Sequence, residues 1–246
     1  MLETFAVILS LTVILAAMVG VSYLRKLAHK EEQKSYQKVA EELGFEYLGT
    51  QKAALLKPIV GHIPKVLRRS TAPLHFVMRK PVEDGVVFYF SCRGNNGISP
   101  VEAGNQYFHQ VALFYSEDMQ LPDFYVRQKR GTLHENLGYR LMHKSIDLVD
   151  YPHLSKQFLV EGSHEAAIQQ LLNYQVVGFL ADNAYLDVRA DQNVLMCYQT
   201  NQANASTDNA MDAISPRLAS LDEVKQILED TTTLYNLLRQ VPVFLR

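Results

Sequence analysis

The longest hydrophobic pattern of the chain is an uninterrupted apolar run near its N-terminus. Residues 5–24 read FAVILSLTVILAAMVGVSYL, twenty residues without a charged side chain. A helix of this length rises about 30 Å, which matches the hydrocarbon thickness of a bilayer. The run therefore predicts a transmembrane anchor over 1–24. A cleaved signal peptide is the alternative, but the preceding Met-Leu-Glu-Thr has no basic residue and the run is long for a signal-peptide core.

Helical spacing continues beyond the apolar run, with fewer apolar positions. Gly44 is a typical helix stop. The apolar positions before it are Leu27, Tyr36, Val39, Ala40 and Leu43. This pattern predicts a juxtamembrane stalk helix over 25–44.

The period then changes to the alternation that is typical of β-strands. From residue 73 the segments PLHFVMRK, GVVFYFSCRG and YFHQVALFYS are rich in Val, Phe and Tyr, and they predict an antiparallel meander. Short strands near 146–149 and 157–160 precede a helix that Ser163 caps. The segments AYLDVRA and NVLMCYQ predict a hairpin, whose turn is formed by Ala190, Asp191 and Gln192.

The last periodic segment is an amphipathic helix. Ser220 and Glu223 form a capping box, and Pro242 ends the run. One stripe repeats at steps of three and four, with Thr231 in the intervening position and the apolar residues Leu221, Val224, Leu228, Tyr235 and Leu238 around it. The stripe predicts packing on the protein's own sheet, and a coiled coil with the stalk or with another protein is the alternative.

These elements predict an α+β fold. An N-terminal transmembrane helix and stalk precede a largely antiparallel β-sheet domain, flanked by helices, over 45–199. Residues 200–216 are small and polar without periodicity, which predicts a flexible linker. The amphipathic C-terminal helix lies within 217–246 and packs on the domain.

Net charge, cysteine content and the distribution of basic residues restrict the possible partners and the cellular compartment. The formal net charge of -2 lacks the basic excess of nucleic-acid-binding domains, so no nucleic acid is expected as a partner. Two cysteines, Cys92 and Cys197, are too few for a disulfide scaffold and suit a reducing compartment. Basic residues follow the apolar run and do not precede it, which places the C-terminal domain in the cytoplasm, at a bacterial inner membrane.

Candidate chemistry is sparse along the chain. Cys92 precedes RGNNG as in the phosphate loop of cysteine phosphatases, but Ile98 stands where that loop needs an arginine. The eight histidines form no i, i+4 pair, so no metal site is expected. Neither a Walker loop nor a GxGxxG motif is present, so no cofactor is expected. A hydrolase site assembled from His109, Glu161 or Cys92 remains an alternative.

Two groups of residues are candidate contact sites. Ala16 and Gly20 form a small-xxx-small pair, which lets a second transmembrane helix approach, and contact with lipid alone is the alternative. The stretch 47–82 holds seven Lys or Arg and no Asp or Glu. It predicts contact with anionic headgroups or a protein partner, or else a solvated loop followed by a first strand. The candidate contact residues here are Lys65, Arg68, Arg69, Arg79 and Lys80.

Several motifs follow one another in a familiar order. The series includes VAEELGFEYLG and GVVFYFSCRG, and its clearest members are Gln110-Val111, the LPDF run of 121–124 and the FLVEG run of 158–162. Their order resembles a family of uncharacterised bacterial membrane proteins with one N-terminal helix and a cytoplasmic α+β domain. The resemblance implies this architecture and assigns no catalytic residue.

The function that these observations predict is non-enzymatic. We expect a membrane-anchored interaction domain, an accessory or assembly subunit of a larger membrane complex, in contact with the lipid bilayer and a protein partner. A lipid- or ligand-binding domain at the membrane surface is the first alternative, and the hydrolase is the second.

Overall fold

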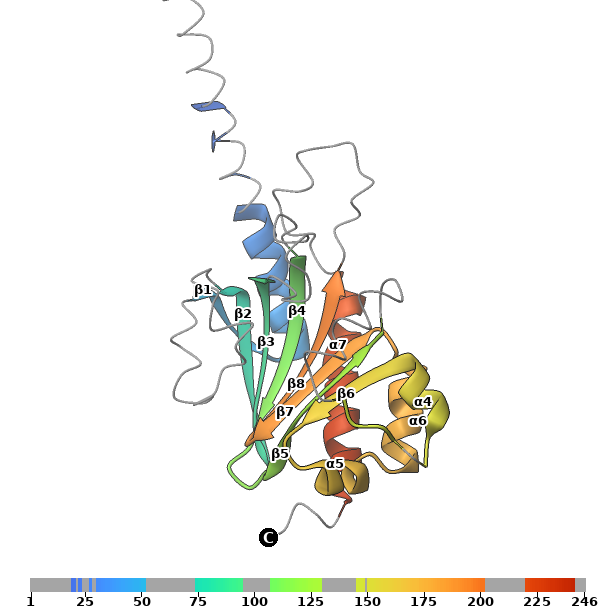
Figure 1. The fold of residues 1–246 in the computed structure, drawn as a ribbon. Helices are drawn as coiled ribbons and strands as arrows, with labels where there is room; N and C mark the ends of the chain where they lie inside the picture. Colours follow the sequence, from blue (N-terminus) through green and yellow to red (C-terminus); the bar gives the residue numbers. More distant parts are fainter. Residues whose placement is uncertain are drawn as a thin grey trace, which may run out of the picture.

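Figure 1 shows the chain as a computed structural model. It describes residues 19–20, 22–23, 27, 30–51, 74–94, 107–129, 145–148, 150–201 and 220–241. Most of the predicted anchor and of the linker 200–216 lies outside these ranges. Within them, no helix has both the length and the apolar composition that crossing a bilayer requires. The anchor therefore stays a prediction.

An eight-stranded antiparallel sheet forms the body of the protein, in the spatial order β1-β2-β3-β4-β8-β7-β5-β6. The predicted meander is confirmed as β2, β3 and β4, which are neighbours in the sheet. The strands are β1 (Glu46–Gln51), β2 (Leu74–Val82), β3 (Gly85–Gly94), β4 (Tyr107–Tyr115), β5 (Leu121–Gln128), β6 (Phe158–Gly162), β7 (Leu186–Gln192) and β8 (Val194–Asn201).

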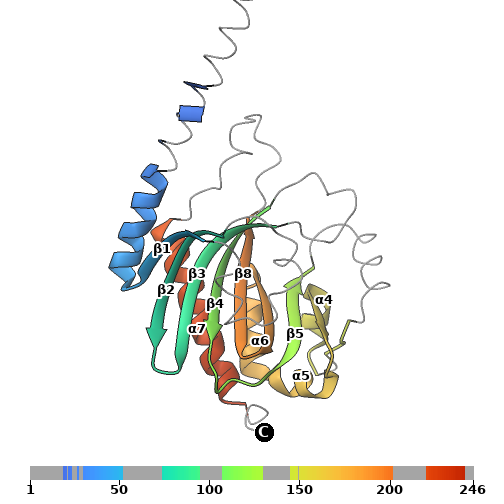
Figure 2. The ribbon, with the colours of Figure 1, turned by 90° about the vertical axis from the view of Figure 1, so that its left-hand side faces the viewer.

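The helices contribute to one large core on one face of the sheet. This core combines inward-facing strand residues with residues from every helix named below. Figure 2 shows α7 passing behind β3 and β4. The helices are the segment 30–43, α4 (Pro152–Gln157), α5 (Glu165–Leu171), α6 (Tyr174–Asp182) and α7 (Leu221–Arg239). The predicted α+β class is confirmed.

The C-terminal helix α7 has the predicted start and the predicted partner. Ser220 Oγ accepts a hydrogen bond from the Glu223 backbone N–H at 3.1 Å, and Glu223 Oε2 accepts one from the Ser220 N–H at 2.8 Å. The capping box is therefore confirmed. The Tyr235 ring stacks on Phe114 of β4 with centroids 3.9 Å apart, so the apolar stripe packs on the protein's own sheet.

The stalk helix joins the same core. Tyr36 is 2% exposed, and its ring stacks on Phe76 of β2 with centroids 4.0 Å apart. Gly44 ends the helix with a left-handed φ of 70°, and the Phe45 N–H donates to the Ala40 carbonyl at 2.7 Å. The helix 30–43 therefore contributes Tyr36, Val39 and Ala40 to the globular core, while Leu27 is exposed.

The opposite face of the sheet has a second apolar core, to which, among the described residues, only strands contribute. It includes Phe88 and Phe90 of β3, Leu113 of β4 and Met196 of β8, all at most 3% exposed. Strands β3, β4 and β8 thus bury both faces, because residues that alternate along each strand enter different cores. Cys92 belongs to this second core and Cys197 to the first, so both cysteines are buried strand residues.

One predicted turn and one predicted helix cap are wrong in position. Ala190 and Asp191 are strand residues of β7, paired with Leu195 and Val194, and the hairpin turns at Gln192 and Asn193. Asn193 Nδ2 bonds the carbonyl oxygens of the loop that follows β4, at 3.0 and 2.9 Å, and this distant contact fixes the turn. Ser163 does not cap α5, since His164 is the N-cap and makes no side-chain cap bond.

Two further predictions near weakly periodic segments need correction, and two short helices are additional. β1 occupies the start of the stretch expected to be a basic loop, since it pairs with β2. The expected strand at 146–149 is only an isolated bridge between Ser145 and Glu161. The short helices α4 and α6 were not predicted, because α4 is six residues long and α6 begins directly after the expected helix.

Candidate functional site

The predicted transmembrane contact pair is described only in part. Ala16 lies outside the described residues. Gly20 is helical and exposed, and a Cβ added there would have no heavy atom within 4 Å. The contact with a second transmembrane helix stays a prediction.

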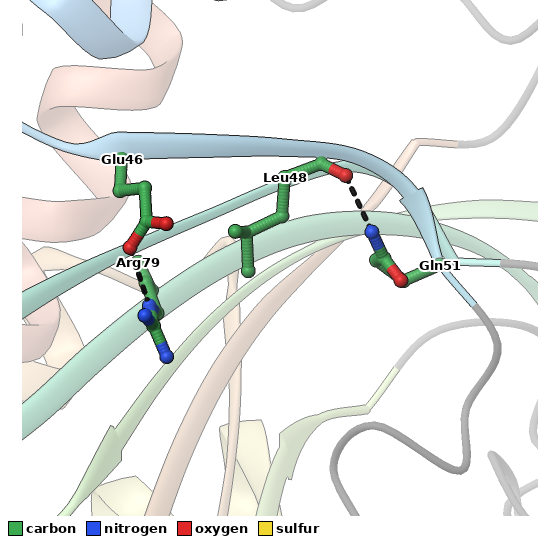
Figure 3. Close-up of polar contacts among 4 residues, drawn as sticks. All are labelled: Glu46, Leu48, Gln51 and Arg79. Atoms are coloured by element: carbon green, nitrogen blue, oxygen red, sulfur yellow. Dashed lines mark hydrogen bonds and ion pairs between the residues drawn. The ribbon is translucent and has the colours of Figure 1, made fainter.

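Of the predicted basic contacts, Arg79 and Lys80 are described, and both lie on β2. Arg79 Nε pairs with Glu46 Oε2 at 2.7 Å, as Figure 3 shows. Lys80 Nζ donates to the Leu43 carbonyl oxygen at 2.9 Å and lies 5.5 Å from the Phe45 ring centroid. These two cations therefore hold β1 and the end of the stalk helix against β2. Lys65, Arg68 and Arg69 lie outside the described residues.

The neighbouring part of β1 bends at its end. Gln51 Nε2 donates to the Leu48 carbonyl oxygen at 2.5 Å, within the same strand (Figure 3). The register of β1 against β2 shifts on both sides of Gly49, which has a φ of 71°. Such bulges twist an edge strand away from regular pairing.

The three hydrolase candidates do not form one site. Cys92 and His109 are backbone partners on β3 and β4. Glu161 lies on β6, and β4, β8, β7 and β5 stand between that strand and β3. In the described ranges, no group of three or more His, Cys, Asp or Glu side chains is arranged to hold a metal ion.

Both thiols are expected to be inert in the folded protein. Burial raises the pKa of Cys92 and of Cys197 to about 12. A thiol reacts as its thiolate, so we expect a maleimide to label neither cysteine of the native chain at neutral pH and both after unfolding, as counted by mass spectrometry. Rapid labelling of the native chain would contradict the buried assignment.

The same pKa shifts predict how stability depends on pH. A folded-state thiol pKa above the unfolded value means that folding favours the protonated thiol. This contribution is fully present below the unfolded pKa of about 8.5 and is lost as the pH rises toward the folded value. Denaturant melts should therefore show falling stability above about pH 9.

Charged and tyrosine side chains gather on the sheet face opposite the helices, over β5, β6, β7 and β8. Tyr125 is the cross-strand partner of both Glu161 and Arg189, and Asp187 is the partner of Tyr198. We call this group the Tyr-Arg cluster, which consists of Tyr125, Arg127, Glu161, Asp187, Arg189 and Tyr198.

The Tyr-Arg cluster contains charged side chains that are buried. Arg127 and Asp187 are each 5% exposed, so charges of both signs are buried together. The Tyr125 and Tyr198 rings stack at 6.2 Å, and burial raises the pKa of Tyr198, with further contributions from the neighbouring Tyr125 and Asp187. Arg189 is partly exposed and reaches Asp123 only at 3.8 Å.

Sequence reasoning did not find this cluster. Asp187 and Arg189 alternate in LDVRADQ, which reads as an ordinary strand with one solvated face. Tyr125 and Glu161 come from β5 and β6, and only the strand order places them beside β7.

Comparison with known proteins shows the fold and no family. No family model matches the chain, and no curated protein matches it. A crystal structure of the mycobacterial trehalose monomycolate transport factor A, TtfA, is similar to this one with a TM-score of 0.50. The match covers 86% of this chain and 96% of that chain at 12% sequence identity. At this identity, the likeness concerns the fold alone.

Proposed function

We propose that the chain is a membrane-anchored, non-enzymatic interaction domain, an accessory or assembly subunit of a larger membrane protein complex at the bacterial inner membrane. The observation that carries this proposal is the stalk helix, which is built into the core of the domain. Tyr36 and Ala40 are at most 2% exposed, and Lys80 binds the last turn of the helix. An anchor that continues into this helix would hold the domain in a defined orientation.

The Tyr-Arg cluster is the proposed surface for the partner. Tyrosine and arginine are enriched at the energetic centres of protein interfaces, because both offer large contact areas together with hydrogen-bond donors. Arg189 has a partly exposed guanidinium, and its ion pair with Asp123 is long, at 3.8 Å between Nη2 and Oδ1. A partner carboxylate can therefore add hydrogen bonds to Arg189 while this ion pair remains.

Binding of anionic lipid headgroups is the alternative function. The positions of Arg79 and Lys80 in the fold weigh against contact between these two residues and the headgroups. Residues 30–43 are helical and span roughly 20 Å along the helix axis. Lys80 binds at the far end of this helix from residue 30. In physiological salt, the attraction between exposed charges is screened beyond about 8 Å. Headgroups beside residue 30 would therefore attract Arg79 and Lys80 only weakly, and these two residues suit a protein partner better.

The test is purification of the full chain from its native membrane in mild detergent, followed by native mass spectrometry. We expect a stoichiometric protein companion that Arg189→Ala reduces at least tenfold, whereas Lys34→Ala, which changes an exposed stalk residue, leaves it unchanged. A chain that carries only anionic lipid would favour the headgroup alternative. A bare monomer or homodimer would sink the accessory-subunit proposal.

A further inference from the structure

The segment that runs from the stalk helix to the end of β1 lies at one edge of the domain. Strand β1 is the first in the strand order and pairs, among the described strands, with β2 alone. Figure 2 shows the helix, in blue, beside β1 at the outer side of the sheet. The helix buries three side chains, those of Tyr36, Val39 and Ala40, whereas α7 buries eight. We call residues 30–51 the strap.

The strap contacts a strained position of β2. Phe76 is 1% exposed and has a left-handed φ of 57°, which is rare for a bulky side chain. It lies in a β-bulge, because three steps from His75 to Met78 on β2 oppose two steps from Ser91 to Tyr89 on β3.

The strain at Phe76 opposes docking of the strap. A backbone of this kind lowers the folding equilibrium constant by roughly tenfold to a hundredfold, and it persists only where its surroundings hold it. The ring of Tyr36, stacked on the Phe76 ring with centroids 4.0 Å apart, is the part of the strap that holds it. Docking of the helix and the conformation of Phe76 are therefore coupled.

A buried hydroxyl group also opposes docking. Tyr47 Oη is buried and has no hydrogen-bond partner. Burial raises the pKa of Tyr47 to about 12, and the neighbouring Tyr36 adds to the rise, so these two side chains lie close together. Lifting the strap would return the hydroxyl group to water, and an unpaired buried group lowers an equilibrium constant by roughly tenfold.

Two polar contacts from β2 fasten the docked strap. Lys80 Nζ donates to the Leu43 carbonyl oxygen at 2.9 Å, where a cation also suits the negative end of the helix dipole. Arg79 pairs with Glu46 at 2.7 Å (Figure 3), but both side chains are about half exposed, so this pair contributes little. The docked state rests mainly on the packing of the helix and on Lys80.

We propose that the strap is a releasable element, which lifts from the sheet as a unit while β3, β4 and β8 stay folded. Lifting lets Phe76 return to an extended backbone, hydrates Tyr47 and uncovers the edge of β2. The domain then keeps a defined orientation to its anchor only while the strap is docked, which adds regulation to the proposed function. The release itself does not depend on the accessory-subunit role, so the two proposals can fail separately.

The test is native-state hydrogen exchange of the full chain in detergent, followed by mass spectrometry of its peptides. We expect strap amides to be less protected than amides of β3 and β4, by a factor of about ten or more, through one common opening. Exchange of the strap should also depend weakly on low concentrations of urea, because its opening exposes little surface.

Two variants should shift the strap in opposite directions. Tyr47→Phe should slow its exchange about tenfold, because it removes the unpaired hydroxyl group. Lys80→Met should speed its exchange about tenfold, because it removes the bond to the Leu43 carbonyl oxygen. Tyr115→Phe is the matched control, since Tyr115 packs on the second core and should leave strap exchange unchanged.

Three results would overturn the proposal. Equal protection and equal urea dependence of the strap and of β3 would mean that the strap opens only with the whole domain. Protection that rises steadily from residue 30 to residue 51 would mean that the helix frays from its end and does not lift as a unit. Strap exchange that neither Tyr47→Phe nor Lys80→Met shifts would mean that these contacts do not control its release.

Discussion

Replacing Tyr36 with alanine is expected to lower the free energy of unfolding by about 4 kcal/mol, as for other large aromatic residues removed from a core. Tyr36 is 2% exposed and stacks on Phe76 at 4.0 Å. Truncation leaves a cavity between the stalk helix and β2 that these packed elements cannot close. The measurement is denaturant unfolding of the full chain in detergent, followed by far-UV circular dichroism, which suits a chain without tryptophan.

Two variants separate ring packing from other effects. Tyr36→Phe keeps the stacked ring, so its cost should be about 1 kcal/mol, the value of one hydrogen bond. Lys34→Ala changes an exposed side chain of the same helix and should stay within about 0.5 kcal/mol. Equal stability of Tyr36→Ala and the wild-type chain would mean that the stalk helix does not pack on the sheet.

The Tyr36→Ala variant also bears on the proposed function. In the proposed function, the stalk transmits orientation only while it is packed on the domain. We therefore expect Tyr36→Ala to release the companion protein even under conditions in which the sheet remains folded. Retention of the companion by this variant would argue against a role for the rigid stalk.

Gly162→Ala is expected to destabilise the fold by about 3 kcal/mol through overpacking. Gly162 ends β6 opposite Phe124. An added Cβ would lie 2.5 Å from the Asp123 carbonyl oxygen and would overlap the Ile168 side chain of α5. The backbone oxygen cannot give way without shifting β5, so the strand-to-helix junction must move. Urea unfolding gives the change in free energy.

The matched control for this substitution is Gly178→Ala. Gly178 lies inside α6, and a Cβ added there has no heavy atom of another element within 4 Å. Alanine is favoured over glycine within a helix, so we expect a gain of about 0.5–1 kcal/mol. Similar effects of the two substitutions would show that the close approach at Gly162 is unimportant.

Local features were predictable from the sequence because they depend on neighbouring residues. The capping box of Ser220 and Glu223 needs only the spacing of those two residues and a following apolar stripe. The run of Val, Phe and Tyr residues in GVVFYFSCRG likewise indicates β3 without knowledge of its neighbours. The edge strand β1 was missed because its pairing with β2, rather than a hydrophobic alternation, makes it a strand.

The candidate site was predictable only in fragments. Tyr47 lies in the motif VAEELGFEYLG, but its buried, unpaired hydroxyl group depends on the stalk helix beside it. Arg79 was expected at a contact surface, and its ion pair with Glu46 arises from the register between β1 and β2. No spacing along the chain relates Tyr125 to Arg189, which come from strands adjacent only in space.

By itself, the sequence determined the α+β class, the meander of β2 to β4 and the C-terminal helix, since the pleat and the helical turn impose their periods locally. The tertiary structure alone decided that β8 lies beside β4 and that β5 lies between β7 and β6. It also decided that the stalk helix belongs to the core. These outcomes depend on burial between segments far apart in the chain, which no local period encodes.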